Sequence, residues 1–477
     1  MKQPGRQVET SPVETVFALQ KISSHRLRLS TAAERAGKLN RLKNWIKSNQ
    51  DKIRKALYED LGKPAMEADF NETYVVLSEI KYACKRLPKW MKPKPVKAHL
   101  PLLGAKSQVY YEPKGCALII SPWNYPFCLT ILPLVSAIAA GCTAIIKPSE
   151  LAPNTARLIS EMIGEIFREN EIAVFEGGLT IAQTLVSIPF DHIFFSGSPK
   201  TGQSIMKSAA DHLTSVTLEL GGKSPVIIDK GCKLKEVAAR VVWGKYINCG
   251  QTCVAPDYLL VHESELDLFL QELKIQVVKM YDPKGRGIEK SPDYGRIINK
   301  NHLRRLESLI SDALSKGAKV EFGGNIREEI IFMAPTIVTQ VGPNMTLMKE
   351  EIFGPILPIL SYSDINQAVN FLNSKPKPLA FYIFSEETYF INFFISRTSS
   401  GTVGVNDCTL QFGHPGLPFG GVNQSGIGKA HGHYGFLAFS NEKAVLRQKT
   451  GITSLRLLYP PYGFNKNRIA RFLSKWI

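Results

Sequence analysis

Residues 214–228 read TSVTLELGGKSPVII, in which two short apolar runs are separated by a pair of glycines. The runs Thr214–Leu220 and Pro225–Ile228 have the length and the composition of buried β-strands. Gly221 and Gly222 open a turn directly after the first run, because glycine adopts backbone conformations that other residues avoid. This segment therefore predicts two buried strands with a tight turn between them.

Similar apolar runs recur on the N-terminal side of this segment, and helical windows lie between most of them. The windows include Asn154–Phe167, with Asn154 as the expected cap, and Thr201–Ala210. Strands that alternate with helices are typical of a parallel α/β sheet. A second alternating set from Leu234 to about Phe384 predicts a second α/β domain. The additional strands predicted for the first set are Cys116–Ser121, Thr143–Lys147, Ala173–Glu176 and His192–Ser196.

The first hundred residues are predicted to be mainly helical. Thr31 and Glu34 form the pattern of a capping box ahead of an apolar stripe at helical spacing. Residues 127–146 form an uncharged stretch of 20 positions, which is the length of a membrane span. They include Pro133 and Gly141, so we interpret them as a buried helix followed by a central strand.

The composition is that of a folded protein. The chain has 477 residues with 44% hydrophobic and 21% charged side chains, which excludes global disorder. A chain of this length is expected to form roughly two to four domains. Its eight cysteines are too few for a disulfide scaffold, and the polar N-terminus lacks the apolar stretch of a secretory signal. We therefore expect a cytoplasmic protein.

The formal net charge of +17 raises the question of a polyanionic partner. Two segments, 81–97 and 464–477, carry basic residues and no acid. The sequence has no RNP-type aromatic motif, zinc-finger spacing or basic zipper. We therefore expect no nucleic-acid partner and interpret the first segment as solvated surface.

The strongest chemical signal is the stretch NCGQTC at 248–253. Two cysteines four positions apart could bind a metal from one face of a helix, but no second ligand pair accompanies them, so we expect no metal site. A lone cysteine is most often an inert small hydrophobe. Gly250 and Gln251 favour a nucleophile at Cys253 instead, because they let the backbone turn closely beside a side chain that must face a pocket.

Glu219 and Asn124 are the candidate partners of this nucleophile. Glu219 stands at the end of an apolar strand, where a buried carboxylate is uncommon unless it is paired or functional. Hydrolysis of a thioester needs a base that activates water, and a carboxylate can supply it. The amide of Asn124, in SPWNYP at 121–126, could donate a hydrogen bond to an oxyanion, and taken alone it also fits a turn.

A phosphate-binding loop is predicted at FSGSPKTG, residues 195–202. It follows a predicted strand and leads into a helix, whose free N–H groups and dipole favour phosphate. The pattern is neither GxGxxG nor a Walker A loop. It indicates dinucleotide binding by an atypical loop.

Together these segments resemble the aldehyde dehydrogenase superfamily from about Leu27 to Arg447, and most closely its class 3 branch, which includes the fatty aldehyde dehydrogenases. Several long motifs occur in the order of the family, and the spacing between Glu219 and Cys253 also matches. The motifs are PWNYP at 122–126, IIKPSE at 145–150, FSGSPKTG at 195–202, LELGGKSP at 218–225, NCGQTCVAPDY at 248–258, EEIFGPILP at 350–358 and LPFGGVNQSGIG at 417–428.

The resemblance implies an α/β aldehyde dehydrogenase fold with a Rossmann-like cofactor domain, an α/β catalytic domain and a small bridging β element. The bridging strands should include Ser107–Glu112 and part of Glu442–Lys449. Class 3 members are usually dimers, so we expect a homodimer. The implied parts are 1–98 and 118–221 for the NAD(P)-binding domain, 222–410 for the catalytic domain, 99–117 and 411–450 for the bridging element, and 451–477 for a C-terminal tail.

The resemblance also implies the role of each candidate residue. Cys253 attacks the aldehyde as a thiolate, and the Asn124 amide holds the oxyanion together with the Cys253 N–H. Glu219, whose pKa we expect burial to raise, activates the water that releases the acid. The residues implied in cofactor binding are Lys147, Glu150, Trp123, Gly197, Ser198, Gly202, Leu220, Glu351 and Phe353.

Within that set, Lys147 and Glu150 match the positions that bind the adenine ribose. Ser198 matches a pyrophosphate contact, and Glu351 and Phe353 match positions at the nicotinamide ribose and ring. Glu150 would repel a 2′-phosphate and favours NAD, whereas Lys147 as a compensating cation keeps NADP open.

The branch and the C-terminal tail predict medium- to long-chain or other apolar aldehydes as substrates. Tyr125, Phe127 and Phe412 either line an apolar tunnel or pack in the core. Residues 464–477 have the pattern of a basic amphipathic helix, which either contacts an anionic membrane surface peripherally or packs on this chain or its partner.

Two rival functions remain. One is a CoA-acylating or reductive relative that stops at the thioester, against which the retained Glu219 argues. The other is a non-catalytic binding protein on the same scaffold, against which Cys253, Glu219 and Asn124 together argue.

Overall fold

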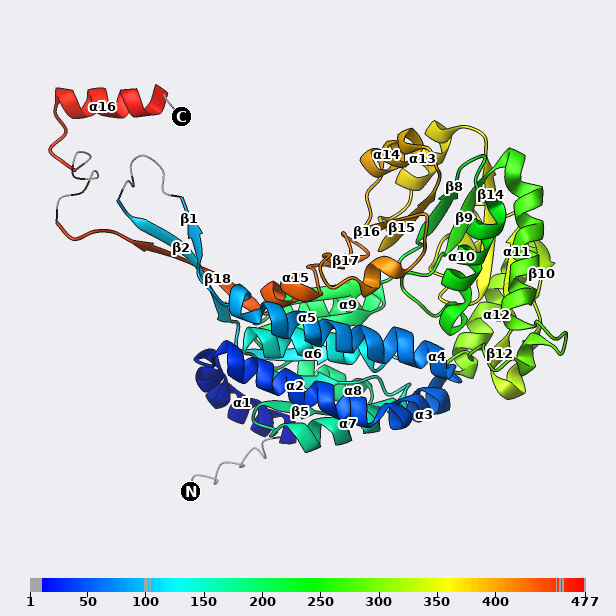
Figure 1. Ribbon diagram of the computed structural model, residues 1–477, viewed down its shortest axis with the longest axis horizontal. Helices are drawn as coiled ribbons and strands as arrows, with labels where there is room; N and C mark the ends of the chain where they lie inside the picture. The colour runs from blue at the N-terminus through cyan, green and yellow to red at the C-terminus, as the bar shows by residue number, and fades with distance from the viewer. Residues whose placement is uncertain are drawn as a thin grey trace, which may run out of the picture.

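The computed structural model describes residues 11–97, 102, 104–451, 453, 456 and 459–475. Their strands form two large, mainly parallel sheets, a three-stranded sheet and one short hairpin (Figure 1). This is the α/β architecture that the alternating pattern predicts.

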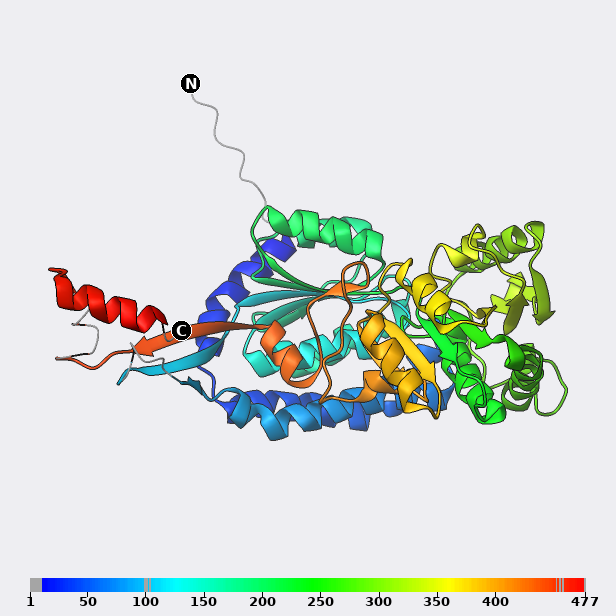
Figure 2. The ribbon, with the colours of Figure 1, turned by 90° about the horizontal axis from the view of Figure 1, so that it is seen from above.

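The first large sheet has six strands in the order β17-β7-β6-β3-β4-β5, of which only β17 is antiparallel to its neighbour. Helices lie on both of its faces, as Figure 2 shows from above. The strands are β3 (Cys116–Ile120), β4 (Thr143–Lys147), β5 (Ile172–Val174), β6 (His192–Gly197), β7 (Ser215–Leu220) and β17 (Gly426–Ile427). The helices include α6 (Cys128–Ala140), α7 (Pro153–Ile166), α8 (Leu179–Val186) and α9 (Pro199–Ala210).

The N-terminal helices belong to the same unit. Leu39, Leu42, Ile46 and Ile53 are fully buried against the residues of α5 and α6 in one core. The segment before α5 is a π-helix, a form that is rare and often found at functional sites. These elements are α1 (Pro12–Arg28), α2 (Ala32–Ser48), α3 (Gln50–Leu61), α4 (Ala65–Glu67), the π-helix η1 (Ala68–Tyr74) and α5 (Val75–Trp90).

The second large sheet has seven strands in the order β10-β13-β14-β9-β8-β15-β16, parallel except for β10. Its strands are β8 (Pro225–Ile228), β9 (Tyr258–His262), β10 (Lys319–Phe322), β13 (Thr336–Thr339), β14 (Ile356–Tyr362), β15 (Ala380–Phe384) and β16 (Thr402–Val405). Its helices are α10 (Leu234–Tyr246), α11 (Leu266–Tyr281), α12 (Lys300–Ser315), α13 (Ile365–Asn373) and α14 (Thr388–Arg397). The hairpin β11 (Ile326–Arg327) and β12 (Phe332–Met333) lies beside it.

The third sheet projects from the six-stranded unit as an arm (Figure 1). It contains β1 (Lys94–Val96), β2 (Lys106–Pro113) and β18 (Ser440–Arg447), all antiparallel. Helix α15 (Gly432–Ala438) precedes β18, and α16 (Phe464–Lys475) lies beyond the tip of the arm (Figure 1). The predicted C-terminal helix is therefore present over these residues, whereas Trp476 and Ile477 lie outside the described part of the chain.

Two local predictions have opposite outcomes. The capping box of Thr31 and Glu34 is confirmed at the start of α2. The prediction that Asn154 caps α7 is wrong, because Ala152 occupies the cap position. A carboxylate from α3 takes over the capping: Asp60 accepts hydrogen bonds from the backbone N–H groups of Asn154 and Thr155 at 3.0 and 2.8 Å.

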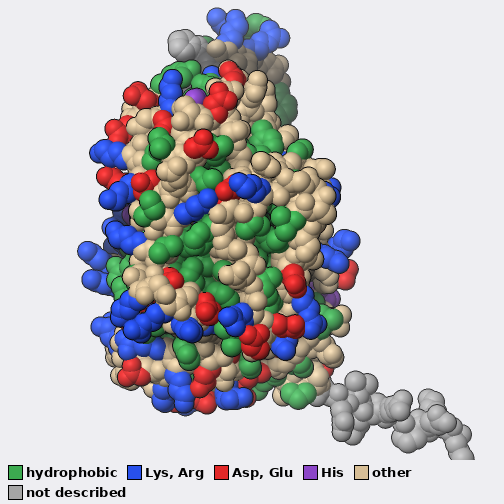
Figure 3. Space-filling view, turned by 90° about the vertical axis from the view of Figure 1, so that its right-hand side faces the viewer, with side chains coloured by type: hydrophobic (Ala, Val, Ile, Leu, Met, Phe, Trp, Pro, Cys, Tyr) green, Lys and Arg blue, Asp and Glu red, His purple; other side chains and the backbone are tan. Residues whose placement is uncertain are grey.

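The uncharged stretch 127–146 forms the buried helix α6 and the strand β4, as predicted. No helix within the described ranges is long and apolar enough to span a bilayer. On the face that Figure 3 shows, Lys and Arg side chains are interspersed with Asp and Glu. The net charge is therefore not gathered into one basic surface on that face.

Candidate active site

Cys253 lies where two cavities meet. The sheet-edge cavity, of about 240 Å³, opens at the carboxyl ends of β6 and β7 and reaches Cys253 from one side. The η1 cavity, of about 340 Å³, reaches Cys253 from the side of the π-helix. Leu129 and Phe412 also line both cavities. The thiol is thus accessible to two different molecules that enter by separate routes.

The loop that carries Cys253 has a strained backbone. Asn248, Cys249 and Gly250 have φ angles of 50°, 54° and 72°, a region that non-glycine residues rarely occupy. A side chain at Gly250 would lie 2.4 Å from the carbonyl oxygen of Gly354, so only glycine fits there. Cys249 is buried, and its 3-10 helix ends at Gly250, so Cys249 and Cys253 do not lie on one helical face.

Gln251 holds this loop in shape. Its side-chain amide donates to the carbonyls of Asn248 and Arg296 at 3.0 and 2.9 Å and accepts from the N–H of Ile298 at 3.0 Å. The N–H of Asn248 donates to the Glu67 carboxylate at 2.9 Å. These bonds stabilise the strained conformation, and they confirm that Gly250 and Gln251 shape the turn beside Cys253.

Asn124 faces the sheet-edge cavity and is 2% exposed. Its Nδ2 donates to the Gln251 carbonyl at 3.0 Å, which leaves the second N–H of this amide for a ligand. The backbone carbonyl of Asn124 accepts hydrogen bonds from Asn248 Nδ2 at 2.8 Å and from Lys63 Nζ at 3.0 Å. Hydrogen bonds therefore hold both the side-chain amide and the backbone of Asn124.

Lys63, which donates to the backbone carbonyl of Asn124, forms an ion pair with Glu72. This pair was not predicted from the sequence. Both side chains are completely buried, and Glu72 also accepts a hydrogen bond from the N–H of Cys128 at 2.7 Å. The Lys63 ammonium lies 4.1 Å from the centre of the Tyr125 ring. Removing one member would leave a buried charge without its partner, so the pair is expected to matter for folding as well as for the site.

Glu219 lies on β7, opposite Ser196 on one side and Gly426 on the other. Its side chain lines the sheet-edge cavity, and neither carboxylate oxygen has a hydrogen-bond partner among the described residues. Burial raises the pKa of Glu219 well above its usual value, and the nearby Lys429 opposes this. The expected desolvation of this carboxylate is confirmed.

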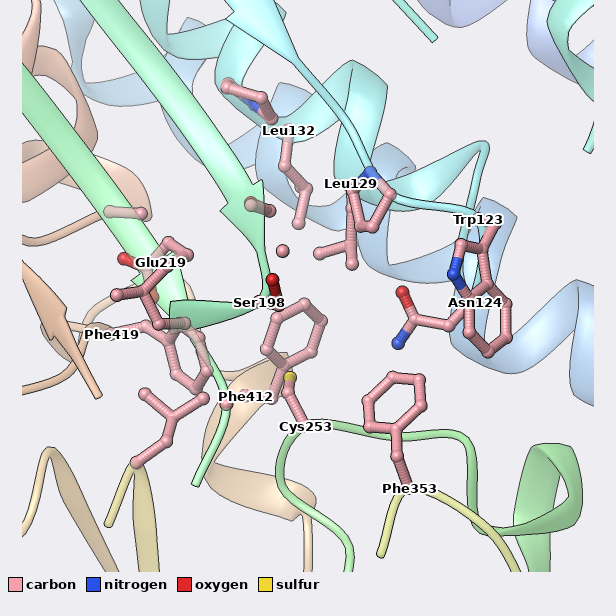
Figure 4. A pocket seen from close by; sticks show the side chains of 18 of the residues that line it. Trp123, Asn124, Leu129, Leu132, Ser198, Glu219, Cys253, Phe353, Phe412 and Phe419 are labelled. Carbon is pink, nitrogen blue, oxygen red and sulfur yellow. The ribbon is translucent and has the colours of Figure 1, made fainter. Parts of the chain in front are cut away.

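Figure 4 shows how these three side chains lie. Cys253 rises from its loop into the cavity, the Asn124 amide lies on one side, and Glu219 lies on the other at the end of its strand. Burial first, and then the charges of Glu351 and Glu219, raise the pKa of the Cys253 thiol to about 12. The protein's own groups therefore favour the thiol over the thiolate that the resemblance implies.

Most residues implied in dinucleotide binding meet at the sheet-edge cavity. Trp123, Gly197, Ser198, Leu220, Glu351 and Phe353 all line it. Lys147, Glu150 and Gly202 do not line it. Lys147 ends β4 and forms an ion pair with Glu150, and Gly202 lies one turn into α9 against Leu220.

The geometry fits a dinucleotide. Ser198 caps the twelve-residue helix α9, accepting a hydrogen bond from the N–H of Thr201, so the helix N-terminus points phosphate-binding groups toward the cavity edge. A side chain at Gly221 would lie 2.0 Å from Oε2 of Glu351, so this glycine lets a carboxylate approach the backbone closely. That carboxylate suits a ribose hydroxyl. Phe353 and Trp123 pack edge to face, 5.3 Å apart, in the same cavity.

The loop that carries Glu351 and Phe353 is held at several points that sequence reasoning also missed. Lys223 Nζ donates to the carbonyls of Leu347 and Glu350 at 2.7 and 3.0 Å. Asp257, which forms an ion pair with Lys223, accepts from the N–H of Ile352 at 2.9 Å. No local sequence pattern predicts these contacts, because they join segments that are far apart in the chain.

The η1 cavity is mainly apolar, and none of the described residues that line it is Lys, Arg, Asp or Glu. Phe70 and Tyr74 of the π-helix stack in parallel, with ring centres 5.6 Å apart. Tyr125 and Phe412 line the cavity, as the tunnel interpretation predicts. The same interpretation is wrong for Phe127, which is fully buried in the core beside α6 and lines neither cavity.

The chain matches a model of the aldehyde dehydrogenase family over residues 7–445. It is 45% identical over 428 residues to 4,4'-diaponeurosporen-aldehyde dehydrogenase of Staphylococcus aureus, with 90% of this chain and 92% of that protein covered. It is 43% identical to aldehyde dehydrogenase family 3 member A2 of Mus musculus, with 92% and 89% covered. The resemblance to the class 3 branch is thereby confirmed.

Solved structures agree with this result. The substrate-bound state of Staphylococcus aureus AldH matches with a TM-score of 0.92 at 42% identity, over 97% of this chain and 100% of that chain. Betaine aldehyde dehydrogenase of the same organism in complex with NAD+ gives a TM-score of 0.84 at 27% identity, over 92% and 88%. The chain therefore belongs to the aldehyde dehydrogenase family and is an NAD(P)-dependent enzyme of that family.

Proposed function

We propose that this enzyme oxidises medium- to long-chain or other apolar aldehydes to carboxylic acids, with Cys253 as the nucleophile. The observation that carries the proposal is the place of Cys253 between a cavity that suits a dinucleotide and a second, apolar cavity. Asn124 and Glu219 lie on opposite sides of its thiol (Figure 4). A relative named for 4,4'-diaponeurosporen-aldehyde supports the assignment of an apolar substrate.

The reaction begins when the Cys253 sulfur bonds to the aldehyde carbon and the thiol proton passes to water. The free N–H of Asn124 and the backbone N–H of Cys253 stabilise the resulting oxyanion. When bound, NAD(P) would supply the acceptor for the hydride that leaves this carbon, and its positive charge would favour the thiolate. A thioester on Cys253 remains.

Glu219 completes the reaction by taking a proton from the water that attacks the thioester, which releases the carboxylic acid and the Cys253 thiol. A carboxylate whose two oxygens are buried and without hydrogen-bond partners among the described residues is free to bind that water. This supports hydrolysis over transfer to CoA, for which no hydrolytic base is needed.

The cofactor would be held by Ser198 at the pyrophosphate, Glu351 at the nicotinamide ribose and Phe353 beside the ring. We propose NAD as the preferred form, because Glu150 is half exposed near the end of β4 and would repel a 2′-phosphate. Its ion pair with Lys147 leaves that lysine less available for a phosphate. In this arrangement both units contact the cofactor, through Ser198 on one side and Glu351 and Phe353 on the other, and the seven-stranded unit supplies Cys253.

The shape of the η1 cavity leads to a prediction about chain length. With NAD, we expect decanal to have a kcat/KM at least about 10-fold above that of acetaldehyde, because each buried methylene contributes about 0.8 kcal/mol. Ser78→Phe, which places a ring in this cavity, should lower kcat/KM for decanal about 10-fold and leave acetaldehyde nearly unchanged.

Reduced-cofactor absorbance measures these rates, and parallel assays with NADP measure the cofactor preference. Lys81→Phe is the matched control, because it adds the same ring to an exposed position of the same helix. Equal losses for both aldehydes in Ser78→Phe would contradict the assignment of the η1 cavity to the substrate. Faster turnover with NADP than with NAD would contradict the cofactor preference.

We also propose that the arm pairs two subunits and that α16 contacts anionic membranes. Strand β18 is an eight-residue, mostly exposed edge of the arm sheet, whose unpaired backbone groups suit association with another chain. Helix α16 carries no acid in its first turn, and Phe464 is 82% exposed. The basic residues of the helix are Lys466, Arg468, Arg471 and Lys475.

We expect the full chain to be a dimer by light scattering and to sediment with vesicles that contain phosphatidylserine. The chain truncated after residue 463 should remain a dimer and stay in the supernatant, since it loses four cations that are each attracted by about 1 kcal/mol near such a surface. Neutral vesicles are the control. A monomeric full chain would refute the arm pairing, and equal sedimentation of both chains would refute membrane contact by α16.

A further inference from the structure

The carboxylate of Glu219 lies in surroundings that oppose its ionised form. It is 9% exposed, and burial is the main influence on its pKa. The titratable and charged side chains that line the same cavity are Cys253, His302, Arg305, Glu351 and His431. His431 is neutral at physiological pH, because burial lowers its pKa to about 4. Lys429, which does not line this cavity, is the charged group that lowers the pKa of Glu219.

Lys429 is held directly behind Glu219. Its Nζ donates hydrogen bonds to the carbonyl oxygens of Gly420 and Gly421. Gly420 fills the space between the two side chains: a side chain at Gly420 would lie 2.9 Å from Oε1 of Glu219 and 3.1 Å from Cδ of Lys429. The side chains of Lys429 and Glu219 thus both lie against Gly420.

The turn that Lys429 holds is itself packed against Glu219. Gly426 of β17 pairs with Glu219 in an antiparallel register, and a side chain at Gly421 would lie 1.9 Å from the Ser425 carbonyl oxygen. This turn therefore has little room to shift while β17 stays paired. The lysine is half-buried, so its charge is screened less by solvent than that of an exposed lysine.

We propose that Lys429 is the positioning residue of the hydrolytic base: it fixes the Gly420–Gly421 turn against Glu219 and supplies the positive charge that keeps this carboxylate ionised for hydrolysis of the thioester. The inference rests on the proposed role of Glu219. Lys429 touches neither the thioester nor the water, so it acts only through Glu219. Hydrolysis is the affected step, because formation of the thioester begins at Cys253.

The sign of the effect follows from electrostatics. An opposite charge favours the ionised form of a carboxyl group, so removal of the Lys429 charge raises the pKa of Glu219. Hydrolysis needs the ionised form, so the acid limb of its pH profile should move to higher pH by about one unit in Lys429→Met. At pH values below the acid limbs of both enzymes, the hydrolysis rate constant of Lys429→Met should be about 10-fold lower than that of the unchanged enzyme. At pH values above both acid limbs, the two rate constants should be equal. Lys429→Arg keeps the charge and should restore the profile.

The experiment measures hydrolysis directly between pH 6 and pH 9. Each enzyme turns over decanal with NAD, acid quenching stops the reaction, and intact mass gives the fraction of chains that carry a decanoyl group. Turnover divided by this fraction is the hydrolysis rate constant, whichever step limits turnover. A displaced limb in Lys429→Met that is restored in Lys429→Arg supports the inference. A fall by the same factor at every pH, or superimposed profiles, overturns it.

Glu219→Gln separates this inference from the proposed function. If Glu219→Gln abolishes hydrolysis and Lys429→Met does not displace the limb, only the role of Lys429 is wrong. If Glu219→Gln hydrolyses the thioester as fast as the unchanged enzyme, the role of Glu219 is wrong, and that of Lys429 falls with it. A thermal melt of each variant shows whether the fold is retained, and a pH-independent loss with a lower melting temperature counts as a structural effect against the inference.

Discussion

Cys253→Ala is expected to lower kcat for any aldehyde by at least about 10⁴-fold, because removal of a nucleophile abolishes the covalent step. The site should otherwise remain intact, since Gln251 and Asn248 hold the loop through contacts that do not involve the thiol. Reduced-cofactor absorbance with decanal measures the loss. Protection by NAD against thermal unfolding should stay the same, which checks that the sheet-edge cavity is retained.

Cys249→Ala is the matched control for this prediction. Cys249 lies four positions away but is buried within the strained turn. Its thiol lines neither cavity, so kcat should remain within about threefold of the unchanged enzyme. Turnover by Cys253→Ala, or its loss in Cys249→Ala with the fold retained, would show that the wrong cysteine has been assigned.

Glu219→Gln should have the second largest effect, a fall in turnover of about 10²–10⁴-fold, because the base that activates water is lost while the shape of the side chain is kept. The acyl group should accumulate on Cys253, since its formation needs the thiol and the Asn124 amide. Intact mass after acid quenching should therefore show most chains acylated in Glu219→Gln and few in the unchanged enzyme.

The control for Glu219→Gln is its pH dependence. The pKa of Glu219 is raised by burial, so turnover of the unchanged enzyme should be lost as the pH falls through that raised value. The variant carries no titratable group at this position, so its residual rate should lack that limb. A variant that remains unacylated while turnover is lost would place Glu219 in the first half of the reaction instead.

The strands and most helices could be predicted from the sequence because their causes are local. The run Thr143–Lys147 is a fully buried strand with a neighbour on each side, as its apolar composition indicates, and the capping box of Thr31 needs only a residue three positions away. Asn154 shows the limit of such reasoning. Its sequence suits a cap, but Asp60 of another helix supplies the capping group, and no local pattern reveals that partner.

The sequence predicts the residues that face the cavity of the candidate site, but not the buried residues that hold them in place. Cys253, Glu219 and Asn124 stand in motifs long enough to identify, and the structure brings them around one cavity. Lys63 and Glu72 stand in no such motif, although they hold the backbone of Asn124. Phe127 shows a related limit, because composition alone does not decide whether an aromatic ring faces a cavity or the core.

The π-helix η1 performs two tasks within seven residues. Phe70, Asn71 and Tyr74 form part of the wall of the η1 cavity, while Glu72 of the same segment is bonded to Lys63 and to the N-terminus of α6. A change that reshapes this wall therefore also disturbs the support of Asn124. Altering substrate preference through η1 should lower the catalytic rate, whereas changes at Leu410 or Trp243, which line the cavity from other elements, should alter preference with less effect on rate.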